Sequence, residues 1–254
     1  MAILEIRKVS KNFGGLAALS HLDIDMHKGE LTGLIGPNGA GKTTLFNVIS
    51  GFYQPTSGVI SFRSENILGQ RMDKIAKRGI VRTWQQTSAL LHNMTALENV
   101  MVGHYVHSKS GFWKSIFNTS SYQREDREVR EKSLDILEFM GILSARDELA
   151  KNLPHGYQRS LGVAVALAAS PELLLLDEPV TGMNPTESTA MMTKIQKIID
   201  KGITVILVEH DMKVVMNICE RIIVLNFGKK IAEGKPEEIR KDKDVIKAYL
   251  GTRK

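Results

Sequence analysis

A segment rich in glycine, residues 36–43 (GPNGAGKT), directly follows the apolar run Leu31–Ile35 and precedes a helical pattern. Glycines let consecutive backbone N–H groups and the start of the next helix surround phosphate oxygens, while Lys42 neutralises their charge. This order and spacing predict a phosphate-binding loop, in which the hydroxyl of Thr43 would hold Mg²⁺. The alternative is a glycine turn that merely joins a strand to a helix.

Acidic groups follow a second apolar run, residues 173–179 (LLLLDEP). Ligand sites of open α/β sheets lie at the carboxyl ends of their strands. There, Asp177 is expected to bind the Mg²⁺ shell, and Glu178 to orient or deprotonate the attacking water in phosphoryl transfer. Taken alone, the segment also fits a strand that ends in a solvated acidic turn.

A histidine follows a third apolar run, residues 203–208 (ITVILV), in the sequence Glu209-His210-Asp211. At a strand's carboxyl end, His210 could sense or stabilise a γ-phosphate. A lone histidine can equally be an ordinary side chain with local partners, and the residues by themselves leave both interpretations open.

The elements that must position these groups alternate along the chain. Apolar and β-branched runs predict strands, and helical patterns and glycine turns separate them, which indicates an α/β fold. Two runs, 173–176 and 205–208, are continuously apolar, as expected for central parallel strands covered on both faces. The predicted strands are residues 4–9, 31–35, 59–62, 173–176, 204–208 and 221–225.

The middle of the chain, residues 98–140, has a helical pattern instead. Its mixed-charge run 123–132 (QREDREVREK) is interpreted as a solvated helix face. The preceding segment 111–117 (GFWKSIF) places aromatic residues beside a lysine, which suits a partner or membrane contact and equally suits packing against the helical lobe.

Size and composition restrict the class of protein. The chain has 254 residues, a formal net charge of +6 and a pI near 9.3, which suits an anionic partner such as nucleotide phosphate, nucleic acid or a membrane surface. Cys219 is the only cysteine, so no internal disulfide can form, and a cytosolic chain is expected. No secretory signal and no apolar run of about 20 residues is present, so any membrane role is expected to be peripheral.

Together with Phe13 in KNFGG, Gln85 in VRTWQQ and Gly156 in LPHGYQR, these segments resemble an ABC-type ATPase from about residue 4 to residue 251. The resemblance implies a single domain, residues 1–254, with the P-loop NTPase fold of the ABC type. A RecA-like core sheet with a small antiparallel β region and a C-terminal extension would occupy residues 1–85 and 168–254. An inserted helical subdomain with the signature loop would occupy about 86–167.

The resemblance also implies roles for individual residues. Phe13 falls where an aromatic ring stacks on adenine, Gln85 where a glutamine contacts Mg²⁺ and links the core to the helical lobe, and Gly156 in the loop that contacts ATP held by the opposite subunit. The implied catalytic residues are Glu178, His210 and Gln85, and the implied metal-binding residues are Thr43, Gln85 and Asp177. The implied ATP-binding residues are Phe13, Gly36, Pro37, Asn38, Gly39, Ala40, Gly41, Lys42, Thr43, Thr44 and, in trans, Gly156.

Within that family, VRTWQQ, the long middle segment, EHDMKVVM and VIKAYLG look like the LivG-type subunit of branched-chain amino-acid importers. This implies an ATPase, converting ATP and water to ADP and phosphate, that powers import of leucine, isoleucine and valine. The implied partners are a second ATPase subunit, as a hetero- or homodimer, integral membrane permease subunits and, indirectly, an extracytoplasmic substrate-binding protein. The implied location is the cytoplasmic face of the cell membrane.

Other functions stay open at this point. The cargo could be urea, amides or aromatic acids, and the basic tail could serve a soluble ABC ATPase that acts on nucleic acid or ribosomes. A small-molecule kinase or GTPase also shares the phosphate-binding loop. The chain departs from the family at residues 153–157, LPHGY in place of LSGGQ, which predicts weakened catalysis in the site this loop completes, and at Asn184, where many relatives have aspartate.

Overall fold

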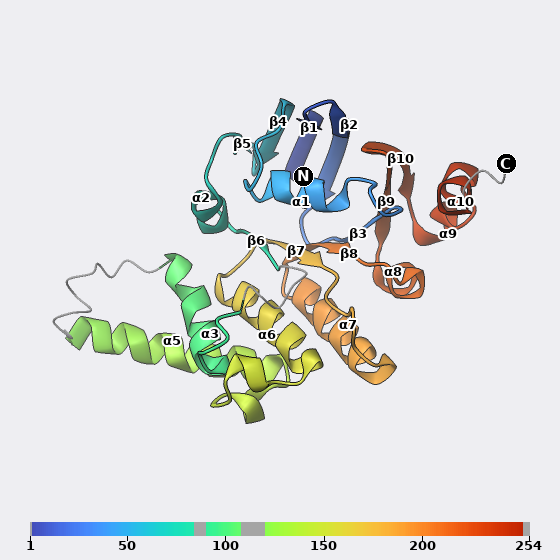
Figure 1. Ribbon diagram of the computed structural model, residues 1–254. Helices are drawn as coiled ribbons and strands as arrows, with labels where there is room; N and C mark the ends of the chain where they lie inside the picture. The colour runs from blue at the N-terminus through green and yellow to red at the C-terminus, as the bar shows by residue number, and fades with distance from the viewer. Residues whose placement is uncertain (1, 84–89, 108–119, 251–254) are drawn as a thin grey trace. The chain divides into compact units, whose positions relative to one another are not determined.

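The computed structural model describes residues 2–83, 90–107 and 120–250, which form two compact units (Figure 1). Gln85 and the aromatic segment 111–117 lie outside the described residues. The core unit comprises Met1–Arg82, Glu172–Glu178 and Ile195–Lys254, and the helical unit comprises Thr83–Pro171 and Pro179–Lys194.

A six-stranded sheet forms the centre of the core unit, with the strand order β10-β9-β3-β8-β7-β6. All neighbouring strands run parallel except β10, which pairs antiparallel with β9 at one edge. Every residue of β3, β7 and β8 is buried, which confirms the prediction that continuously apolar runs form central parallel strands. The strands are β3 (Leu31–Ile35), β6 (Ile80–Arg82), β7 (Leu173–Asp177), β8 (Thr204–Val208), β9 (Arg221–Asn226) and β10 (Lys229–Gly234).

A second, antiparallel sheet of the core unit has the strand order β2-β1-β4-β5. Its long hairpin turns at Gly14 and Gly15, where Gly14 has a φ of 56° that suits glycine in a two-residue turn. Buried and exposed side chains alternate along much of β2, as expected for a strand with one covered face. The strands are β1 (Ala2–Phe13), β2 (Leu16–His27), β4 (Ser57–Phe62) and β5 (Glu65–Asn66).

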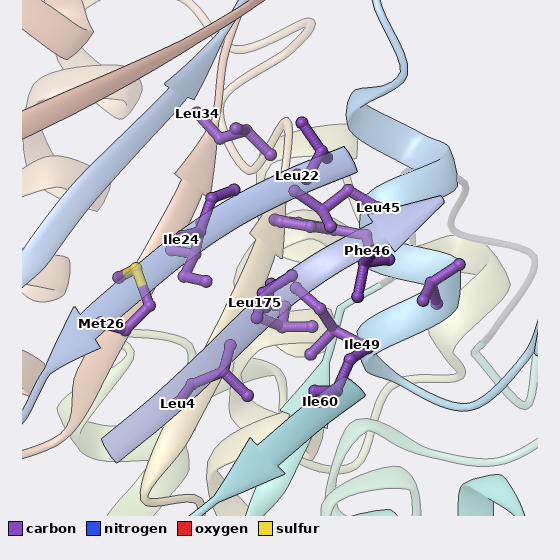
Figure 2. Close-up of a cluster of buried hydrophobic side chains, with 14 of the residues drawn as sticks. Leu4, Leu22, Ile24, Met26, Leu34, Leu45, Phe46, Ile49, Ile60 and Leu175 are labelled. Carbon is purple, nitrogen blue, oxygen red and sulfur yellow. The ribbon is translucent and has the colours of Figure 1, made fainter. Parts of the chain in front are cut away.

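Helix α1 (Lys42–Ile49) packs between the two sheets, and its apolar side chains fill the main hydrophobic core. Figure 2 shows Leu45, Phe46 and Ile49 of this helix among side chains of the antiparallel sheet, with Leu175 of β7 in the same cluster. Phe46 and Ile49 are fully buried. The helix that begins with Lys42 is therefore held rigidly by packing on both sides.

Among the described residues, the core unit also contains four helices: α2 (Met72–Lys77), α8 (Met212–Ile218), α9 (Pro236–Ile239) and α10 (Lys243–Leu250). Helix α8 packs closely on β3, because a Cβ atom at Gly33 would lie 2.7 Å from Val215 and 3.1 Å from the Cys219 sulfur. Cys219, just after α8, is buried, and burial raises the pKa of its thiol to about 12.

In the helical unit, α3 (Ala96–His104) and α6 (His155–Ala168) pack closely at Gly103, where a Cβ atom would lie 2.4 Å from the Val165 carbonyl oxygen. Helix α3 begins with a capping box: Thr95 accepts the N–H of Glu98, whose carboxylate accepts the N–H of Thr95. The remaining elements are the 3₁₀ turns η2 (Tyr105–His107), η3 (Leu143–Ala145) and η4 (Ala150–Asn152), the helix α5 (Ser120–Phe139) and the start of α7 (Pro185–Asp200), which ends in the core unit.

The helical pattern predicted for residues 98–140 is present as α3, η2 and α5, with residues 108–119 outside the described part. Side chains of the charge run 123–132 on α5 are exposed or half-buried, in agreement with a solvated helix face. Among the described residues, no helix combines the length and apolar composition needed to span a bilayer.

Candidate functional site

The loop between β3 and α1, residues 36–41, surrounds the side chain of Lys42, the first residue of α1. The Lys42 ammonium group donates to the carbonyl oxygens of Gly36 at 2.6 Å and Pro37 at 3.1 Å. Lys42 is 7% exposed, and burial holds its pKa below the usual value, although the nearby carboxylates of Glu178 and Asp177 act in the opposite direction. The lysine is thus a buried cation held next to two acidic side chains.

Glycines are required where this loop meets its neighbours. A Cβ atom at Gly36 would lie 2.1 Å from the Leu225 carbonyl oxygen, and one at Gly41, whose φ is 105°, would lie 2.7 Å from the Ala18 carbonyl oxygen. The turn after β9 also holds the loop, since the Gly228 N–H donates to the Ala40 carbonyl at 3.0 Å. These contacts fix the path of the loop from three sides.

Helix α1 starts at Lys42 without a side-chain cap. The first N–H groups of a helix have no partner within the helix, and the helix dipole adds partial positive charge at this end. The N-terminus of α1 and the ammonium group of Lys42 therefore provide a site for an anion with the charge and size of phosphate groups. Thr43, next in the helix, has an exposed side chain.

Asp177 ends β7, where its carboxylate is buried and paired with Arg82 of β6. The Arg82 guanidinium donates to Asp177 Oδ2 at 2.7 Å, and both side chains are at most 4% exposed. The same guanidinium donates to Asn47 of α1 and lies 5.5 Å from the ring centre of Phe46. Arg82 therefore ties the acidic end of β7 to the helix that carries Lys42.

Glu178 follows directly and adopts a left-handed backbone with a φ of 52°, which is uncommon for a residue other than glycine. Its N–H donates to the Val208 carbonyl of β8 at 2.9 Å, which extends the pairing of β7 with β8. The side chain is 8% exposed, and its Oε1 lies 2.6 Å from Nε2 of His210. Strained backbone at such a position is typical of functional sites.

The structure thus brings together the groups that three separate sequence segments contribute. Lys42, Asp177, Glu178 and His210 all lie at the carboxyl ends of β3, β7 and β8 in the core unit. His210 is half-exposed, and Asp211 after it caps α8 by accepting the Lys213 N–H at 2.8 Å. Since His210 is bonded to a buried carboxylate, it is not an isolated surface histidine.

Phe13 lies at the end of β1 in the core unit and is 41% exposed. Its ring makes an edge contact with Tyr53 at 5.1 Å between centres, and the Lys11 ammonium lies 5.0 Å from its ring centre. A partly exposed aromatic ring of this kind can stack on a planar ligand.

The loop before α6 and the loop before α7 adjoin within the helical unit. A Cβ atom at Gly156 would lie 3.0 Å from the Glu187 carboxylate, and one at Gly182 would lie 2.7 Å from the His155 ring. Asn184 has a local role, because its side-chain oxygen accepts the Glu187 N–H at 2.9 Å and Glu187 accepts the Asn184 N–H at 3.0 Å. This reciprocal cap starts α7.

The residues present fit Mg²⁺ as well as phosphate. Mg²⁺ prefers hard oxygen ligands, usually one or two from the protein, with water and substrate phosphates completing its shell. The Thr43 hydroxyl and the Asp177 carboxylate are ligands of this kind.

Arg82 was missed by the sequence analysis, because no spacing connects it with Asp177, 95 residues away.

Comparison with known proteins agrees with this geometry. A family described as "ABC transporter" matches residues 19–181, and one described as "Branched-chain amino acid ATP-binding cassette transporter" matches residues 229–254. The chain is 42% identical over 250 residues to the high-affinity branched-chain amino acid transport ATP-binding protein BraF of Pseudomonas aeruginosa. It is 40% identical to the protein of the same description, LivG, of Escherichia coli, and each alignment covers 98% of both chains.

Solved structures of ATP-binding cassettes have the same fold. A nucleotide-free cassette from an ABC transporter superposes with a TM-score of 0.86 at 33% identity, covering 99% of this chain and 100% of that one. A dimeric cassette in a post-hydrolysis state, bound to ADP and Pi, gives a TM-score of 0.79 at 26% identity, covering 92% of this chain and 98% of that one. The fold expected from the sequence, a P-loop NTPase of the ABC type, is confirmed.

Proposed function

Because the chain belongs to the family of ABC transporter ATP-binding subunits and hydrolyses ATP, we propose that it powers the import of branched-chain amino acids. The observation that carries this proposal is the similarity to BraF and LivG over 98% of each chain. Leucine, isoleucine and valine are the proposed cargo. The match of residues 229–254 to the branched-chain amino acid family supports the same assignment.

In the proposed mechanism, Glu178 positions and deprotonates the water that attacks the γ-phosphate. Its carboxylate is at the end of a buried strand, and the hydrogen bond with His210 at 2.6 Å fixes its direction. Phosphoryl transfer requires mainly such positioning and stabilisation of charge. His210, which is half-exposed, is the side chain proposed to contact the γ-phosphate while it holds Glu178.

Lys42 is proposed to exchange its two carbonyl partners for the oxygens of the β- and γ-phosphates. Lys42 is the first residue of α1, so its ammonium group belongs to the same segment as the free N–H groups at the start of that helix. Because burial lowers the pKa of Lys42, an anionic ligand beside it would favour the charged form and gain a stronger interaction than at a solvated lysine. Residues 36–44 are the proposed phosphate-binding residues, and Phe13 the proposed adenine contact.

The proposed Mg²⁺ ligands are the Thr43 hydroxyl and the Asp177 carboxylate, with Gln85 as a predicted third that lies outside the described residues. Bound Mg²⁺ would neutralise charge on the β- and γ-phosphates during transfer. Arg82 orients Asp177 through its hydrogen bond of 2.7 Å. A buried carboxylate held in this way would keep its position when nucleotide and Mg²⁺ bind or dissociate.

We further propose that two ATPase subunits hold ATP between them, with Gly156 and the N-terminus of α6 facing the nucleotide of the opposite subunit. The core unit carries the phosphate-binding loop and the helical unit carries Gly156. In a dimer, each ATP site would then combine the phosphate-binding loop of one chain with Gly156 of the other. The partner is proposed to be a second, different ATPase. The helical subdomain, residues 86–167, would contact the permease subunits at the cytoplasmic face of the membrane.

The test is to capture the chain from native membranes, identify the co-purifying proteins and reconstitute the complex in proteoliposomes for ATPase and leucine-uptake assays. Permease subunits, a second ATPase, and leucine uptake lost in Glu178→Gln are expected. Uptake of urea, amides or aromatic acids in place of leucine would overturn the proposed cargo assignment. Co-purification of ribosomes or nucleic acid without permease subunits would overturn the proposal that the chain powers an importer.

A further inference from the structure

The ring of Phe13 contacts an aromatic side chain from a different part of the core unit. Tyr53 lies in the segment that follows α1, and the two ring planes are inclined at 75° with their centres 5.1 Å apart. An edge contact of this geometry is a favoured arrangement of two aromatic rings. The partly exposed ring of Phe13 is therefore held at a defined angle by a neighbouring side chain.

Tyr53 is itself fixed from several sides. Its side chain is partly buried and packs against the main hydrophobic core. Its N–H donates to the carbonyl oxygen of Asn47 in α1 at 3.0 Å, and the ring of Phe52 makes a second edge contact with it at 4.9 Å between centres. Because α1 begins with Lys42, these contacts give Tyr53 a defined position relative to the helix that is proposed to bind phosphates.

Lys11 on β1 places one cation against both rings. Its ammonium group lies 5.0 Å from the ring centre of Phe13 and 5.5 Å from that of Tyr53. Both distances are within the range of cation–π attraction. The same ammonium group donates to the carbonyl oxygen of Gln54 at 2.8 Å, which holds it in place. Lys11 therefore adds a second restraint on the position of the Phe13 ring.

The backbone also ties the end of β1 to the segment that carries Tyr53. The N–H of Thr56 donates to the carbonyl oxygen of Ser10 at 2.7 Å, and the N–H of Asn12 donates to the hydroxyl oxygen of Thr56 at 3.0 Å. The contact between the two rings is thus supported by hydrogen bonds between the chain segments on which they lie.

We propose that Tyr53 is a positioning residue for nucleotide binding, which holds Phe13 at the angle and the distance from α1 that allow the adenine to stack while the phosphates bind at the start of α1. Lys11 supports the same ring from β1. This inference rests on the proposed adenine contact of Phe13. It requires that Tyr53 contributes to binding of the base and not to binding of the phosphates.

The test compares ATP with inorganic tripolyphosphate, which has the phosphates and no base. Affinities of both ligands, each with Mg²⁺, are measured by equilibrium binding to the full chain carrying Glu178→Gln. Tyr53→Leu, which keeps an apolar side chain and removes the ring, should lower the affinity for ATP about two- to tenfold and leave that for tripolyphosphate unchanged. Tyr53→Phe retains the ring and should retain both affinities.

The cation is tested in the same assay. Lys11→Met should lower the ratio of ATP affinity to tripolyphosphate affinity about two- to fivefold, and the ratio removes any general effect of the lost charge on anion binding. Arg63→Met is the matched control, because it removes a guanidinium that lies 5.5 Å from the ring centre of Phe62 in the same sheet. This control should leave the ratio unchanged.

Phe13→Ala is the reference for loss of the stacking ring itself. It should lower ATP affinity about tenfold or more without affecting tripolyphosphate, and in this background Tyr53→Leu should have little further effect. No loss of ATP affinity in Tyr53→Leu, an equal loss for both ligands, or a loss that persists in full without Phe13 would overturn the positioning role. Unchanged ATP affinity in Phe13→Ala would overturn the adenine contact and this inference with it, whereas the importer proposal is decided separately by the uptake assay.

Discussion

Replacing Arg82 by methionine should destabilise the core unit far more than the loss of an ordinary surface ion pair. Methionine retains the length of the side chain and removes the guanidinium that bonds Asp177 and Asn47. The Asp177 side chain is 2% exposed, so its charge would stay buried after the guanidinium bonded to it is removed. Breaking a buried pair in this way costs about 3–5 kcal/mol in the free energy of unfolding.

The assay is urea denaturation of the nucleotide-free chain followed by circular dichroism. Arg63→Met is the control, because the Arg63–Glu172 pair belongs to the same unit but its side chains are 51% and 37% exposed. An exposed pair contributes about 0–1 kcal/mol. Adding Asp177→Asn to Arg82→Met should restore part of the lost stability, since the buried carboxylate that had lost its bonded guanidinium is then gone.

Two results would refute this reasoning. An equal loss of unfolding free energy in Arg82→Met and Arg63→Met would mean that burial does not strengthen the dependence of Asp177 on Arg82. A double variant less stable than Arg82→Met alone would mean that the loss of stability arises from lost packing of Arg82 against α1 and not from the buried charge.

Three further changes test other parts of the structure. Gly103→Ala should destabilise the helical unit by about 1–3 kcal/mol through the clash with α6, as measured by thermal denaturation. Gly162→Ala, which has open space around it, should be neutral or stabilising in the same assay. Thr95→Ala should cost about 1 kcal/mol by removing the cap of α3, and Thr95→Ser should recover it. Burial opposes ionisation of Glu30, but Arg221 holds the pKa of Glu30 below the usual value. The contribution of the ionised Glu30 to the free energy of unfolding is therefore present above about pH 4.5 and lost as the pH falls through the lower folded pKa. Glu30→Gln should cost about 2–3 kcal/mol at pH 7 and little in strong acid, as measured by urea denaturation across pH.

The sequence predicted those strands whose side chains are all buried. The prediction for residues 204–208 coincides with β8, and that for 173–176 lies within β7, because continuous apolar runs are unambiguous when two faces must be covered. Strand β2 was not predicted, since its polar residues alternate with apolar ones over a segment that includes His21 with a positive φ. Its pairing with β1 explains why β1 extends beyond the predicted residues 4–9.

The parts of the site carried by strand ends were equally accessible to sequence reasoning, because parallel strands place their carboxyl ends at one edge of a sheet. Lys42, Glu178 and His210 come together for this reason. Arg82 did not follow from any motif, since it acts through Asp177, a partner distant in sequence whose proximity depends on tertiary packing. The left-handed backbone of Glu178 likewise results from how the chain leaves β7 and has no signal in the residue type.

The buried thiol of Cys219 makes the native chain a convenient background for chemical labelling. Burial raises the pKa of this thiol to about 12, so it stays protonated and unreactive at pH 8, and the packing of α8 on β3 also shields it from reagents. Since it is the single cysteine, a cysteine introduced on the surface could carry a fluorophore or spin label without removal of the native one. The slow rate at which Cys219 itself is modified would then report the local opening of α8 from the sheet.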